Sequence, residues 1–62
     1  MSKALLITQC KDPLRWYANM IGQLVEYGGD AGNGEYRSRE PEGYINFVLH
    51  SDSKIVEVSN EA

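Results

Sequence analysis

The stretch Gly28–Gly34 places four glycines, an aspartate and an asparagine within seven residues. Glycine adopts positive φ angles without a steric penalty, and Asn and Asp tolerate them better than most residues, so this cluster favours a reversal of the chain. Runs with β character flank it at 23–27 and 35–39. The segment therefore predicts the tip of a β-hairpin. In the strand predicted at 35–39, Tyr36 and Ser38 lie on one face, and Arg37 and Arg39 lie on the other.

Three further runs have the pattern of strands and are bounded by turn residues. Residues 3–9 are apolar at the successive positions 4–7, so both faces of this strand are expected to be covered. Residues 44–49 and 54–58 alternate, and turn-forming residues precede each of them at 40–43 and 50–53. The shared faces are expected to hold Ile45, Phe47 and Leu49 in one strand and Val56 and Val58 in the other.

Between the first two strands, the sequence has the signals of a short helix at 13–21. Asp12 is a favourable N-cap residue, Pro13 suits the first helical position, and Gly22 suits the residue that ends a helix. One buried face is expected from the spacing of Leu14, Tyr17, Ala18 and Ile21. A helix of this length is not stable alone, so it is expected to lie against the sheet.

The whole chain has 62 residues, which allows one domain with one core. Five short strands in a flat sheet would leave one face wet and two edges open, and closure of the sheet avoids both problems. We therefore expect a mainly β fold: a small five-stranded antiparallel barrel, with a short helix inserted after the first strand. Its ordered core is expected at about residues 3–58, followed by a polar tail.

Particular segments also resemble known proteins. The order of the elements, with the segment 42–48 (EGYINFV) before a last strand, resembles SH3-like small barrels, in which a Gly-Tyr-Ile/Val segment precedes a turn and a final strand. More narrowly, residues 12–23 (DPLRWYANMIGQ) and 40–45 (EPEGYI) resemble short proteins of bacteriophages and their bacterial hosts. The resemblance implies an SH3-like fold and a phage-encoded accessory protein that acts in the host cytoplasm, with a host enzyme or complex as its partner.

The charge balance disfavours partners that are bound through phosphates. Nine carboxylates outnumber six Lys and Arg, giving a net charge of −3, and Arg37 and Arg39 are followed closely by Glu40 and Glu42. Nucleic-acid backbones are bound by clustered cations. The single Cys10 cannot form an internal disulfide, which fits a reducing cytoplasm, and the longest apolar run, residues 4–7, is too short to span a membrane.

The chain has six aromatic residues, more than so small a core encloses. Exposed Tyr and Trp side chains are common in protein interfaces, although they also line core rims with their polar ends in water. We therefore expect a partner-binding surface formed by Trp16, Tyr17, Tyr36, Arg37, Arg39 and Tyr44. The alternative is a nucleic-acid-binding barrel that uses Trp16, Tyr36, Arg37 and Arg39. A third interpretation is homo-oligomerisation through a strand edge, so the protein is expected to be a monomer or a small homo-oligomer.

No catalytic residues, metal or cofactor are expected. Cys10 and His50 each occur once, and a Cys–His nucleophilic pair would need a third orienting group and a water-excluding cleft, for which so small a barrel has little volume. One cysteine and one histidine cannot supply the four ligands of a structural zinc site. The sequence therefore predicts a non-enzymatic protein that acts by binding.

Overall fold

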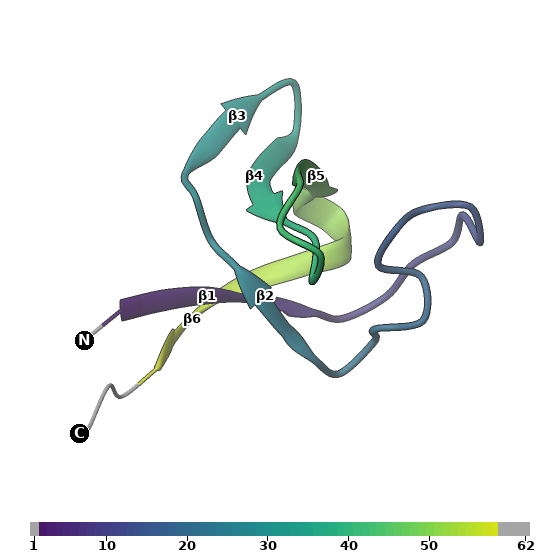
Figure 1. Cartoon of the computed structure of the whole chain (residues 1–62), viewed down its shortest axis with the longest axis horizontal. Coiled ribbons are helices and arrows are strands. Elements are labelled where there is room, and N and C mark those ends of the chain that lie inside the picture. Colours follow the sequence, from purple (N-terminus) through teal and green to yellow (C-terminus); the bar gives the residue numbers. More distant parts are fainter. Residues whose placement is uncertain (1, 59–62) are drawn as a thin grey trace.

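A computed structural model describes residues 2–58, which form six strands and one short 3₁₀ helix (Figure 1). The elements in chain order are β1 (Ser2–Ile7), β2 (Leu24–Glu26), β3 (Asp30–Gly32), β4 (Glu35–Arg39), β5 (Ile45–Leu49), η1 (His50–Asp52) and β6 (Ser53–Val58). Within this part of the chain there is no helix of the length and apolar character needed to cross a membrane. The predicted polar tail after Val58 lies outside the described residues.

The strands form two antiparallel sheets of three strands each. Their orders are β2-β1-β6 and β3-β4-β5, and Figure 1 shows the second sheet above the first. The prediction of a mainly β fold is confirmed. The predicted closed barrel of five strands is not formed, because the strands divide between two sheets. The structure also has a sixth strand, β3, which lies within the glycine-rich segment.

The segment from β2 to β3 belongs to both sheets. β2 pairs with β1, and beyond it Gly28 N–H donates to the carbonyl of Arg37 in β4 at 2.8 Å, while Arg37 N–H donates to the carbonyl of Gly29 at 2.8 Å. A side chain at Gly28 would place its Cβ 3.2 Å from the Arg37 carbonyl oxygen, so glycine allows this close approach. Ser38 adds a third link, since its hydroxyl donates to the carbonyl of Glu26 at 2.7 Å.

A hairpin forms on β4 as predicted, but its other strand is β3, which lies inside the glycine-rich segment predicted as the tip, whereas β2 pairs with β1. β3 pairs with β4, and the turn between them is made by Asn33 with φ 55° and Gly34 with φ 76°. Two successive positive φ angles are what a type I′ turn requires, and Asn-Gly is its preferred sequence. The carbonyl of Gly34 accepts a hydrogen bond from His50 N–H at 2.8 Å, which ties the tip to the end of β5.

The predicted helix at 13–21 is wrong, although its local signals are present. The carboxylate of Asp12 accepts the N–H of Leu14 at 3.0 Å, and Gly22 has φ 87°. The backbone between them makes a series of four-residue turns in place of continuous helical hydrogen bonding. In one of these turns, Ala18 N–H donates to the carbonyl of Arg15 at 3.1 Å. Leu14 is 91% exposed, so the expected buried face is not formed either.

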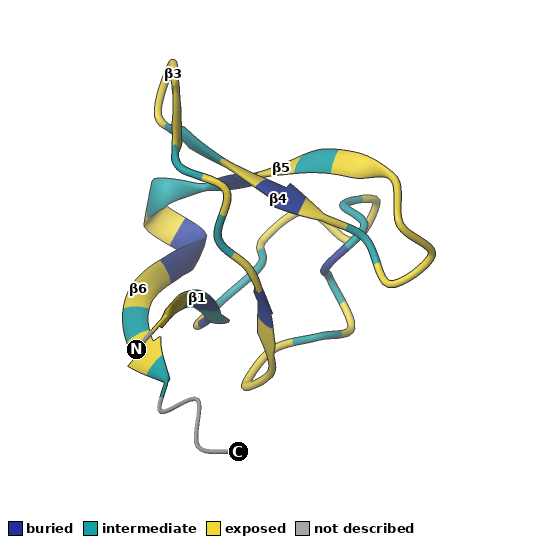
Figure 2. Cartoon of the chain, turned by 60° about the vertical axis from the view of Figure 1, so that its left-hand side comes forward, coloured by how far each residue is buried: buried dark blue, intermediate teal, exposed yellow. Residues whose placement is uncertain are grey.

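The core lies between the two sheets and is small. Its buried apolar side chains are Leu5, Ile7, Tyr17, Val25 and Val48. In Figure 2 the buried positions form short stretches on the strands, one of them where η1 joins β6. In β1, Leu5 and Ile7 point inward, so the alternating residues Ala4 and Leu6 lie on the outer face of the sheet.

Candidate binding surface

The open edge of β5 is covered by side chains. β5 is the last strand of its sheet, so one of its two sides has no neighbouring strand. On that side the carbonyl of Phe47 accepts a hydrogen bond from the indole Nε1–H of Trp16 at 2.9 Å, and Phe47 N–H donates to Oδ1 of Asn46 at 2.8 Å. Backbone groups satisfied in this way are not free to pair with another strand. Recognition on this side therefore depends on side chains.

Tyr17 fixes the loop between β1 and β2, which also carries Trp16, to the core. Its hydroxyl donates to Oδ2 of Asp52 at 2.5 Å and accepts the N–H of Leu49 at 3.4 Å. Tyr17 is fully buried and Asp52 is 3% exposed. Burial, followed by the hydrogen bond to Asp52, raises the pKa of Tyr17 to about 12. Tyr17 is thus a structural anchor. The prediction that it lies on an exposed partner-binding surface is wrong, because its side chain is fully buried.

A groove lies between this loop and the second sheet. It has a volume of about 340 Å³. Its apolar walls are Leu14, Trp16 and Phe47, and its polar lining is Asp12, Arg15, Glu35 and Asn46. Trp16 also packs edge-on against Tyr17, with ring centroids 5.5 Å apart, so this wall of the groove is held in place from behind.

Apolar side chains continue from the groove along β5. Ile45 and Phe47 point to the outer face of the sheet and are 50% and 37% exposed, and Tyr44, just before the strand, is 71% exposed. We call the combined set the β5 surface; it consists of Leu14, Trp16, Ile45 and Phe47. An exposed cluster of large apolar side chains is typical of a contact site for another molecule.

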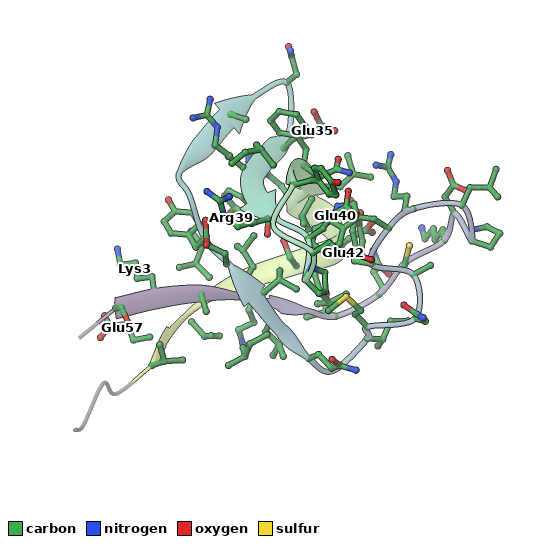
Figure 3. The ribbon with its side chains drawn as sticks, in the orientation of Figure 1. Lys3, Glu35, Arg39, Glu40, Glu42 and Glu57 are labelled. Atoms are coloured by element: carbon green, nitrogen blue, oxygen red, sulfur yellow. The ribbon has the colours of Figure 1, made fainter. Side chains whose placement is uncertain are left out.

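Carboxylates surround the β5 surface. Asp12 and Glu35 line the groove, against the single cation Arg15. Figure 3 shows Glu35 on β4 and Glu40 and Glu42 in the turn that follows β4. Glu40 is linked to the groove, because its carboxylate accepts a hydrogen bond at 2.7 Å from the amide of Asn46.

The two predicted arginines lie beside the β5 surface, in different states. The register of β4 with β5 places Arg37 opposite Phe47 and Arg39 opposite Ile45. Arg39 forms an ion pair with Glu26 at 3.4 Å and donates to the carbonyl of Gly43 at 2.7 Å. Among the described residues, no hydrogen bond or ion pair engages the guanidinium of Arg37.

Tyr36 is separated from these arginines. It points to the opposite face of β4, where its ring packs edge-on against Tyr27 at 5.7 Å between centroids and tilted against His50 at 4.1 Å. His50 Nε2 in turn lies 3.3 Å from a carboxylate oxygen of Asp30. Of the predicted site residues, Trp16, Arg37 and Arg39 lie beside Ile45 and Phe47 of β5, Tyr44 is exposed just before that strand, and Tyr17 and Tyr36 lie elsewhere.

Three members of the β5 surface were not predicted as site residues. The helical spacing predicts that Leu14 is buried, and the alternation at 44–49 predicts only that Ile45 and Phe47 share one face. The larger apolar side chains of β5 lie on that face, yet the structure buries Val48 on the opposite one, so side-chain size along the strand does not indicate which face points inward. The two unique residues do not act together: the thiol of Cys10 donates to the carbonyl of Asp12 at 3.1 Å, whereas His50 contacts Tyr36 and Asp30.

No protein-family model, curated protein or solved structure matches this chain.

Proposed function

We propose that this protein is a non-enzymatic binding module that holds a basic segment of another protein on its β5 surface. The observation that carries the proposal is a groove of about 340 Å³ in which the large side chains of Leu14, Trp16 and Phe47 lie beside the carboxylates of Asp12 and Glu35. A groove of this size accepts one or two side chains, and the large aromatic and aliphatic walls supply contact area at low entropic cost.

The charges around the groove set the chemistry of the partner. Two carboxylates and one guanidinium line it, and Glu40 and Glu42 add negative charge in the turn after β4. Arg37 and Arg39 lie on the neighbouring strand β4, Arg39 being paired with Glu26, and the whole chain has a net charge of −3. Complementary potential accelerates association and discriminates against partners of like charge. The partner segment is therefore one with an apolar anchor residue next to Lys or Arg.

The resemblance to SH3-like phage proteins extends this proposal to a biological setting. The partner would be an enzyme or complex of the bacterial host, in the host cytoplasm, at a basic site that otherwise receives nucleic acid. A compact acidic domain with a few aromatic anchors suits such a site, because it offers negative potential and apolar contact together.

Direct binding of nucleic acid is the competing function, and two contacts argue against it. Arg39 is held by Glu26 and by the carbonyl of Gly43, so its charge is already compensated. Tyr36 lies on the face of β4 opposite to Arg37, so these two cannot stack and neutralise the same nucleotide.

Selection of displayed random peptides against the purified protein tests the proposal. We expect enriched peptides to combine an apolar residue with Lys or Arg, and we expect Phe47→Ser to abolish their binding. Ile21→Ser is the matched control, because Ile21 is another exposed large apolar residue, at 54%, and is not part of the β5 surface. Enrichment without basic residues, or binding that survives Phe47→Ser, would refute the proposal. Titration with oligonucleotides, followed by Trp16 fluorescence, is the parallel arm: quenching there without peptide binding would assign the nucleic-acid function.

A further inference from the structure

The outer face of the first sheet, on the side away from the core, is apolar. The buried residues of this sheet, Leu5, Ile7 and Val25, point inward. The pairing of β1 with β2 and β6 therefore assigns the alternating residues to the other face, which carries Ala4, Leu6, Leu24, Val56 and Val58. Leu24 is 50% exposed, and the other four are half-buried.

Such a face is unusual for an antiparallel sheet with one side on the core. The solvent side of these sheets is commonly polar, which gives the alternation of apolar and polar residues along each strand. β1 departs from that alternation because Ala4 and Leu6 are apolar as well as Leu5 and Ile7. An exposed apolar face of this kind is typical of a contact surface for another molecule.

Two charged residues occupy opposite corners of this face. Glu26 of β2 is paired with Ala4, and Lys54 of β6 is paired with Leu6. With strands ~4.8 Å apart and a rise of ~3.4 Å per residue, the two side chains are separated by ~10 Å across the sheet and ~7 Å along it. The other diagonal of the same rectangle joins Leu24 and Val56.

We propose that the outer face of the first sheet binds a second copy of this chain in a symmetric dimer. A two-fold axis in the plane of the interface, perpendicular to the Glu26–Lys54 diagonal, places Glu26 of each copy against Lys54 of the other. The same axis passes close to Leu24 and Val56, so each of these meets its own counterpart. The strands of the two sheets then cross at roughly 70°, close to the orthogonal class of sheet packing. Charge and shape on this face are thus self-complementary.

The area of the face sets the strength of the contact. β1 and β6, with six residues each, and β2, with three, cover roughly 240 Å² in projection, whereas stable dimers bury ~800 Å² per partner. The dimer is therefore a weak one that forms at high micromolar to millimolar concentration. The inference is independent of the β5 surface, which lies on the other sheet.

Amide chemical shifts, recorded by NMR over a dilution series from millimolar to micromolar protein, test the proposal. We expect concentration-dependent shifts in β1, β2 and β6 and a change in sedimentation coefficient over the same range. Glu26→Lys alone and Lys54→Glu alone each replace two attractive contacts with two repulsive ones, so each should weaken dimerisation by roughly tenfold or more. The double variant, with the two charges exchanged, should restore it.

Two controls separate this contact from other effects. Arg39→Gln removes the ion pair that Arg39 forms with Glu26 inside one chain and frees Glu26 for Lys54 of the other copy, so it should not weaken dimerisation. Phe47→Ser alters the β5 surface and should leave dimerisation unchanged. The proposal is overturned if no shift depends on concentration, if the shifts map to β5, if the double variant is as weak as the single ones, or if Arg39→Gln weakens the dimer as much as Glu26→Lys does.

Discussion

Removal of one oxygen atom from the core, by Tyr17→Phe, is predicted to lower the free energy of unfolding by about 2–3 kcal/mol at neutral pH. The hydroxyl of Tyr17 donates to Asp52 at 2.5 Å, and Asp52 is only 3% exposed, so its carboxylate would lose a hydrogen bond that water does not readily replace. The phenyl ring remains, so the packing against Trp16 at 5.5 Å is kept and no large cavity forms. For a domain of this size, with ~3–9 kcal/mol of total stability, the loss is substantial.

Urea unfolding provides the measurement, with fluorescence of Trp16, the single tryptophan, as the probe. Tyr27→Phe is the matched control, because Tyr27 is half-buried against Tyr36 and no hydrogen bond of its hydroxyl is found in residues 2–58. That variant should differ from the wild type by less than ~0.5 kcal/mol. A similarly small effect for Tyr17→Phe would refute the reasoning, since it would mean that Asp52 does not depend on this donor.

Three further predictions concern the same scaffold. The pKa of Tyr17 is about 12 in the folded protein and that of an unfolded tyrosine is about 10, so the stability linked to its proton is complete below pH ~10 and decreases as the pH rises towards ~12, by about 3 kcal/mol in all. The stability difference between wild type and Tyr17→Phe should therefore narrow in urea titrations across this range, and a constant difference would contradict the assignment. Gly43→Ala should cost about 1–2 kcal/mol, because Gly43 has φ 106° in the turn before β5; a melting temperature equal to that of the wild type would exclude this strain. Trp16→Phe keeps an aromatic wall in the groove but removes the donor to the carbonyl of Phe47. Urea unfolding followed by circular dichroism should show that the free energy of unfolding falls by about 1 kcal/mol, and an unchanged value would show that water replaces the indole N–H.

Much of the sheet structure follows from local sequence patterns. The alternation at 35–39 predicted β4 with its two faces, and the Asn33-Gly34 pair is the local signal for the turn before it. Both features depend on backbone preferences and on the side-chain period of two, which a single sequence displays. The separation of the strands into two sheets depends on how the segment 24–32 bends, and this is decided by its contacts with β1 and β4.

The loop between β1 and β2 shows why the rest was not predictable. Trp16 and Tyr17 are adjacent in sequence, yet one donates to Phe47 and the other to Asp52 at the edge of β5 and its following turn. Adjacent residues in a helix point about 100° apart, so a regular helix cannot make both contacts. These partners are more than 30 residues away. The wrong prediction of a helix here also made the predicted binding surface wrong at two residues, because the exposure of Leu14 and the burial of Tyr17 both depend on the conformation of this loop.

The shared segment from β2 to β3 has a consequence for how the protein opens. Because β1 binds one end of it and β4 the other, detaching this segment removes a strand from each sheet at once. Neither sheet then keeps more than two strands, and an isolated pair of strands is marginal in water. The slowest-exchanging amides of β1 and β4 are thus expected to exchange with solvent at the same free energy, as members of one cooperative unit.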